Sequence, residues 1–325
     1  MTSSKFSLAD LLTVLTALGF SYICFLGLNF YSLGNTSKSI LNTLLILTLL
    51  GGTALGTKVL KKTSRNFKTS LVFELILLTF FLGLIVIFSI SPFPHYFHVN
   101  EQKDEIQKEL IENISQAENL FREYEEYALL RENMYKNKLN SIVNSKRINS
   151  SDYEYYGFTF DNISDDLQIQ NKLFTIHAEL FPSNYSDSMN NNGIKEVATE
   201  WLQNAKKTTT NWKSIGIVSI VNDVEKNTND WKNILVSLSK VKQKGENAED
   251  FNYELSFENV KGNLTTLKKP NTTSTIFAIG TCILMLFSYF ISERHSKSPG
   301  FKKIVKQIIR PNSTVKEKGN YDIDY

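Results

Sequence analysis

Four long apolar stretches limit what this chain can fold into more than any other feature of its sequence. They cover residues 11–31, 39–57, 72–93 and 272–292, and Glu74 is the only Asp, Glu, Lys or Arg inside them. Each has the length of a bilayer-crossing helix, which needs roughly 17–25 residues. The first has too long an apolar core for a cleavable signal peptide. We therefore predict a mainly α-helical membrane protein with four transmembrane helices.

Basic residues beside these stretches predict their orientation. The loop 58–69 holds five Lys or Arg residues and the segment 293–310 holds six, whereas the loop between the first two stretches holds only Lys38. Basic loops remain on the cytoplasmic side of a membrane. We therefore expect residues 1–10 and 293–325 in the cytoplasm of a bacterium, the four helices in its inner membrane, and residues 98–270 as a periplasmic domain.

The segment 98–270 differs in charge from the rest of the chain. It carries 21 basic and 27 acidic residues, whereas the remainder has an excess of basic residues. Because that positive charge lies beside apolar stretches, it indicates a membrane surface and excludes nucleic acid as the expected partner. Cys24 and Cys282 both lie in apolar stretches, so the segment has no disulfide and must be held by a core.

Helical periodicity dominates the segment 98–270. Apolar residues recur at steps of three and four from Ile106 to Ile142, with one miss at Arg131, and predict a helix over 101–144. Similar repeats predict helices over 163–181, 194–219 and 231–241. The apolar stripe of the first of these contains Ile163, Leu167, Phe174, Ala178 and Phe181.

Two other segments alternate between apolar and polar residues. In the first, 251–260, Phe251, Tyr253, Leu255 and Phe257 share one face, and 153–160 shows the same alternation. We expect these segments to be strands that pair with each other or with other short strands. The predicted fold is thus a mostly helical extracytoplasmic domain with a small β-sheet.

Glu74 is a candidate functional residue because an acid inside a membrane stretch often belongs to a proton or ion path. It lies near the predicted cytoplasmic end of its helix, where it can reach water or the basic loop 58–69. No further acid or Arg occurs deeper in the four stretches. The structural interpretation, an acid satisfied at the membrane edge, is therefore favoured.

His95 and His98 are the only candidates for a metal site. They are three residues apart, with Glu101 and Asp104 following, and on one continuous helix they would share a face. Pro92 and Pro94 disturb that helix, and the aromatic residues around His95 are typical of a membrane interface. We accordingly predict no metal and no cofactor.

A short basic segment follows the last apolar stretch. Residues 299–311 place apolar and basic side chains on opposite sides of a helix, which predicts a helix lying on an anionic membrane surface. A docking site for a protein is the alternative. The residues concerned are Phe301, Lys302, Lys303, Ile304, Lys306, Ile308 and Arg310.

The sequence contains no nucleotide-binding, nucleophile-elbow or metalloprotease motif, so we predict no enzymatic activity and no catalytic residue. We expect the extracytoplasmic domain to bind a ligand or another membrane or envelope protein. The chain would then act as a scaffold, an assembly factor or a sensor-like subunit. The alternative is an accessory or pore-forming subunit of a membrane transport system.

Overall fold

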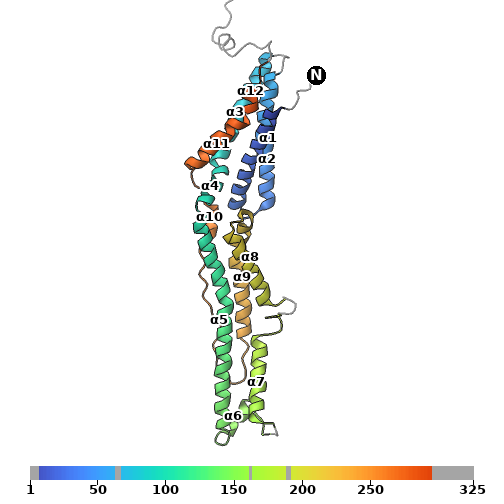
Figure 1. Ribbon diagram of the computed structural model, residues 1–325. Coiled ribbons are helices and arrows are strands. Elements are labelled where there is room, and N and C mark those ends of the chain that lie inside the picture. Colours follow the sequence, from blue (N-terminus) through green and yellow to red (C-terminus); the bar gives the residue numbers. More distant parts are fainter. Residues whose placement is uncertain (1–6, 63–66, 161–162, 188–191, 295–325) are drawn as a thin grey trace, which may run out of the picture. The chain divides into compact units, whose positions relative to one another are not determined.

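The computed structural model describes residues 7–62, 67–160, 163–187 and 192–294, and within these ranges its regular structure is helical (Figure 1). The chain divides into two compact units. Residues 1–28, 36–97 and 268–325 form one, here called the membrane unit, and residues 29–35 and 98–267 form the other, here called the polar unit.

The apolar stretches of the sequence form the helices of the membrane unit. They are α1 (Leu8–Tyr31), α2 (Thr36–Lys62), α3 (Phe67–Ile90), α4 (Phe93–Glu101), α11 (Thr272–Met285) and α12 (Phe287–Ile291). Three segments are long and apolar enough to cross a membrane: α1, α2 and the stretch Thr69–Glu101, which contains most of α3 and all of α4. The chain is thus a multi-pass membrane protein with three such helices.

The predicted fourth transmembrane helix is not confirmed as a single span. Residues 272–292 form α11 and α12, which are individually short because the helix is interrupted at Leu286. Helix α3 ends at Ile90, ahead of Pro92 and Pro94, as those prolines predict. Asn271 caps α11 by accepting a hydrogen bond from the Ser274 N–H at 2.8 Å.

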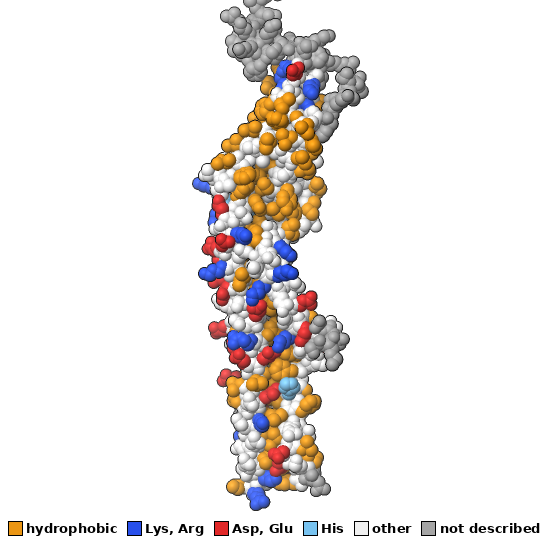
Figure 2. All heavy atoms as spheres, viewed as in Figure 1, with side chains coloured by type: hydrophobic (Ala, Val, Ile, Leu, Met, Phe, Trp, Pro, Cys, Tyr) orange, Lys and Arg blue, Asp and Glu red, His pale blue; other side chains and the backbone are white. Residues whose placement is uncertain are grey.

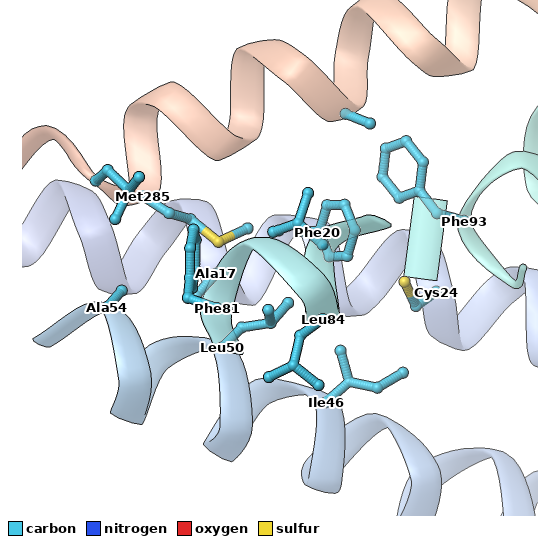
Figure 3. Packing of buried hydrophobic residues seen from close by; sticks show 13 residues of the cluster. Ala17, Phe20, Cys24, Ile46, Leu50, Ala54, Phe81, Leu84, Phe93 and Met285 are labelled. Atoms are coloured by element: carbon cyan, nitrogen blue, oxygen red, sulfur yellow. The ribbon is translucent and has the colours of Figure 1, made fainter. Parts of the chain in front are cut away.

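A compact apolar core joins the helices of the membrane unit (Figure 3). The rings of Phe20 and Phe93 stack with their centroids 4.4 Å apart, and Leu50 and Phe81 are fully buried. Other large apolar side chains point outward, among them Leu15, Ile76 and Ile276, and Figure 2 shows this apolar surface as orange atoms around α11. Exposed apolar surface of this extent on long helices is suited to contact with lipid.

The polar unit is assembled along one long helix. Its elements are α5 (Lys103–Asn144), α6 (Ser150–Tyr155), α7 (Asp165–Leu180), α8 (Ile194–Thr210), α9 (Ser214–Ser239) and α10 (Val260–Thr265). Helices α8 and α9 pack against the first part of α5 around Phe121 and Tyr124. Helix α7 packs against its last part around Tyr135 and Leu139. The helix predicted over 101–144 is confirmed.

The predicted small β-sheet is wrong for the described residues, which contain no strand. In the segment 153–160, Tyr153 and Tyr155 belong to α6, and the chain turns at Gly157, whose φ is +75°. Residues 251–258 are extended, and their burial alternates as predicted, but no neighbouring segment forms a ladder with them. Period-two alternation predicts an extended chain with one buried face, and here helices bury that face.

The helix boundaries predicted between 194 and 241 are also wrong. A single interruption at residues 211–213 replaces the one expected after 219. The Trp212 N–H donates to the Thr209 carbonyl at 3.0 Å and the Lys213 N–H to the Thr208 carbonyl at 3.1 Å. Trp212 has a φ of +46°, so α8 ends in a Schellman motif. Glycine normally marks this motif, and its absence here hid the boundary.

Candidate functional site

Glu74, the acid predicted as a candidate, lies in a cluster of polar side chains in the membrane unit. Its side chain is 1% exposed and accepts two hydrogen bonds from Arg294, at 2.7 and 3.0 Å, and one from the Tyr289 hydroxyl at 2.7 Å. Lys61 donates to the Tyr289 carbonyl at 2.7 Å and lies 4.5 Å from the centre of its ring. Such a two-point Arg–carboxylate contact balances the charge of a buried acid.

A second acid, Asp10, is buried in the same unit. It forms an ion pair with Lys58 of α2, and both side chains are 8% exposed. The Ser288 hydroxyl of α12 also donates to Asp10, as does the Ser7 hydroxyl at 2.9 Å. The carboxylate therefore has hydrogen-bond donors from two other helices as well as from its own helix start.

These two clusters meet at α12. Ser288 contacts Asp10, and the next residue, Tyr289, contacts Glu74. At the interruption before α12, the Met285 carbonyl accepts a hydrogen bond from the Thr13 hydroxyl at 2.9 Å. Hydrogen bonds between membrane helices stabilise packing by about 0.6 kcal/mol each. These contacts join α12 to α1, α2 and α3, so their main effect is to hold the four helices together.

Sequence reasoning missed Asp10 because it precedes the first apolar stretch. A signal was present, since Ser7 and Asp10 have the spacing of a capping box. The Ser7 N–H donates to Asp10 at 2.9 Å, and the Asp10 N–H donates to the Ser7 hydroxyl at 3.3 Å. This motif starts α1 before the apolar stretch begins, so Asp10 lies within the first turn of the helix.

The histidines do not assemble a metal site in the described part of the chain. His95 and His98 both lie on α4, and His95 is 2% exposed. His98 Nδ1 lies 3.7 Å from a carboxylate oxygen of Glu101. No group of three or more metal-ligating side chains occurs among the described residues. The predicted surface helix, which contains Phe301, Lys302, Lys303, Ile304, Lys306, Ile308 and Arg310, lies outside those residues.

Helix α7 presents apolar residues on two faces. Ile169, Ile176 and Leu180 are buried against α5. Most of the predicted stripe is instead exposed, with Phe174 at 74% and Leu167 at 47%, whereas its last residue, Phe181, packs against Tyr124 and Tyr185. The helix was predicted correctly and its buried face was not, because either stripe fits a helical repeat. A large aromatic side chain exposed on a water-facing helix is a candidate contact surface.

The apolar repeat of α5 is interrupted at Arg131 because this residue forms a buried ion pair. Its side chain is 2% exposed and pairs with Glu246, which is 4% exposed. It also donates to the Ser239 carbonyl at the end of α9, at 2.8 Å, and to the Val241 carbonyl. Burial by itself lowers the pKa of Arg131, but the hydrogen bond and charge of Glu246 outweigh it and hold the pKa above its usual value. The ion pair and these hydrogen bonds therefore hold the loop 240–250 against α5.

Comparison of the chain with protein-family models, with curated proteins and with solved structures finds no match. The fold and the contacts described above are therefore the observations on which a function can be based.

Proposed function

We propose that the chain is a bacterial inner-membrane protein whose periplasmic domain, residues 98–270, binds a partner protein and so acts as a scaffold, assembly factor or sensor-like subunit. In this proposal four helices cross the membrane and both termini are cytoplasmic. The fourth would consist of α11 and α12, which together cover residues 272–291. The contacts of α12 with the other membrane helices support that assignment.

The exposed stripe of α7 is the observation that carries the proposal. Phe174 and Leu167 lie one helical repeat of seven residues apart on the face turned away from α5. Leu130 and Met134, one turn apart on α5, are 61% and 57% exposed. Burying a side chain of this size contributes about 1.5–3 kcal/mol relative to leaving it in water. A partner protein that covers these side chains would gain that free energy on binding.

Photo-crosslinking in the native membrane tests this proposal. A benzophenone amino acid at Phe174 should give a discrete crosslinked protein product, whereas the same group at exposed Lys136 on α5 should not. A product that is a second copy of the chain would make the partner the protein itself. If neither Phe174 nor Leu167 gives a product that Lys136 lacks, partner binding at this surface is excluded.

A transport subunit is the second candidate, and the two buried acids favour it. The side chains of Asp10 and Glu74 are both at most 8% exposed in a membrane unit, where buried ionisable residues are a common feature of ion paths. Both are paired with cations and hydrogen-bonded by hydroxyl groups. These contacts account for the two acids without an ion path, so we prefer the partner-binding proposal.

A further inference from the structure

The loop 29–35 holds part of the polar unit at a membrane surface. It joins α1 to α2, which are both long and apolar enough to cross a membrane, yet it belongs to the polar unit. The Asn222 side chain of α9 donates a hydrogen bond to the Leu33 carbonyl at 2.6 Å. Gly34 packs on Val218, where an added Cβ would lie 3.2 Å from Cγ1. The beginning of α9 therefore lies beside a short connection between two membrane helices.

The start of α5 supplies a second, separate anchor. This helix begins at Lys103, just after the membrane-crossing stretch Thr69–Glu101. The Lys103 amine lies 5.9 Å from the centre of the Trp212 ring, and the Gln107 side chain donates to the Thr209 carbonyl at 2.6 Å. These contacts place the turn between α8 and α9, here called the 206–215 turn, at the end of α5 that the chain connects to the membrane.

The side chains of the 206–215 turn are suited to a membrane surface. Ile215 is 51% exposed, and Trp212 is partly buried. Lys207 and Lys213 are exposed, and neither forms an ion pair with any described residue. Tryptophan is enriched at the level of the lipid headgroups, and lysine is attracted to anionic lipid. The turn thus combines an apolar contact with two available positive charges.

Charge also distinguishes this turn from the rest of the predicted periplasmic domain, in which acidic residues outnumber basic ones. Residues 201–222 contain three Lys and no Asp or Glu. Lys206 pairs with Glu118 of α5 at 3.4 Å. The acidic residues at the start of α5, Asp104 and Glu105, pair with neither of the other two lysines. An anionic partner is therefore favoured, and phospholipid headgroups are the anionic groups that the two anchors bring beside the turn.

We propose that the 206–215 turn anchors the polar unit to the membrane surface. Trp212 and Ile215 enter the headgroup region, where their apolar groups leave water. Lys207 and Lys213 lie beside the headgroups of anionic phospholipids. The anchor does not rest on the partner-binding function, since it needs only that α1 and α2 cross a membrane. It is also separate from the exposed stripe of α7, because that helix packs against the last part of α5.

Tryptophan quenching by brominated lipid tests this contact in the full-length chain in lipid nanodiscs. Lipid with bromine on its acyl chains should quench part of the wild-type emission. Trp212→Phe should remove that quenching, whereas Trp201→Phe should retain it. Trp201 stacks on Trp231, which packs against Phe121, and at 1.5 Å per residue Phe121 is about 27 Å along α5 from Lys103.

The role of lipid charge is tested by placing the bromine either on phosphatidylglycerol or on phosphatidylcholine, in discs of the same overall composition. The two lysines should make the anionic lipid quench Trp212 at least about twofold more strongly than the zwitterionic one. Lys207→Gln combined with Lys213→Gln should remove this preference. Lys136→Gln combined with Lys226→Gln, which removes the same charge from exposed positions elsewhere, should not.

Ile215→Ser gives a second test that leaves Trp212 in place. It should reduce the quenching, whereas Ile234→Ser, at another exposed isoleucine of α9, should not. Helicity by circular dichroism should be unchanged in each variant. Quenching that survives both Trp212→Phe and Ile215→Ser, absence of quenching in the wild type, or equal quenching by the two brominated lipids would each overturn the proposed anchor. Crosslinked products at Phe174 alongside such a result would leave the partner-binding function standing.

Discussion

The two units of this protein differ in where their large apolar side chains are exposed and resemble each other in burying charged side chains. In the membrane unit, large apolar residues such as Ile76 and Ile276 are exposed on outward faces, whereas in the polar unit acidic and basic side chains are scattered over the surface seen in Figure 2. Yet each unit buries an ion pair, Asp10–Lys58 in one and Arg131–Glu246 in the other. A buried ion pair therefore does not indicate which solvent a helix faces, whereas the extent of exposed apolar surface along a helix distinguishes the two units.

The ion pairs differ in what remains when the cation is removed. Asp10 would keep hydrogen bonds from Ser7 and Ser288. Among the described residues, Glu246 would keep only the Gln243 N–H, at 2.8 Å, and the carbonyls of Ser239 and Val241 would lose the Arg131 donor. Because an unpaired buried charge is costly, the pair in the polar unit should be the more sensitive of the two.

Arg131→Met should have the largest effect. We expect the polar unit to lose roughly 3–5 kcal/mol of unfolding free energy, because Glu246 remains buried without its cation. Trp201, Trp212 and Trp231 are the only tryptophans and all lie in this unit, so urea unfolding followed by tryptophan fluorescence reports on it alone. The double variant Arg131→Met, Glu246→Met should recover much of the loss. A loss below about 1 kcal/mol in the single variant would show that the pair is not structural.

Lys58→Met should have a smaller effect, and in the membrane unit only. It removes one charged hydrogen bond from Asp10, which is worth roughly 1.5–3 kcal/mol. Cys24 and Cys282 are the only thiols and both lie in this unit, so a thiol-reactive dye reports its thermal unfolding. Lys62→Met, an exposed neighbour on α2, is the matched control. If Lys58→Met destabilises its unit more than Arg131→Met destabilises the other, the comparison between the two pairs fails.

The sequence predicted the elements that depend on local pattern. Apolar length predicted the three helices that are long enough to cross a membrane, and the repeat from Ile106 to Ile142 predicted α5. At the start of α7, Ser164 is a residue type that commonly caps helices, and it accepts a hydrogen bond from the Leu167 N–H at 3.3 Å. These features need only neighbours in the chain, which is why one sequence suffices for them.

The sequence could not predict features that depend on which segments meet. The alternation in 251–258 is the same whether strands or helices bury it, and the two apolar stripes of α7 fit a helix equally well. The partner of Glu74 is Arg294, which is 220 residues away, and the partner of Arg131 is Glu246, which is 115 away. Their positions in apolar stretches or repeats make Glu74 and Arg131 stand out in the sequence, but only the fold identifies their partners.

The ion pair Lys146–Asp165 should have the smallest effect, because it is half-exposed and screened by water. Asp165 accepts hydrogen bonds from Lys146 and, at 2.6 Å, from the Tyr153 hydroxyl, and these two contacts hold its pKa below the usual 3.8. A carboxylate whose pKa is lower in the folded state adds stability above its unfolded pKa and loses it as the pH falls through the folded value.

We expect Lys146→Met to reduce the unfolding free energy by less than about 1 kcal/mol at pH 6. The difference from the wild type should shrink at pH 3, below the usual pKa of 3.8, because the stability that the lowered pKa of Asp165 supplies is lost on acidification. Urea midpoints by tryptophan fluorescence at both pH values measure it, with exposed Lys136→Met as the control for loss of a positive charge. Effects of pH that are common to the variant and the wild type cancel in this difference, so its change between the two pH values reports on this pair. A difference that stays constant between the two pH values would mean that Lys146 stabilises α7 by packing against the Tyr153 ring, 5.8 Å from its amine, and not through the charge of Asp165.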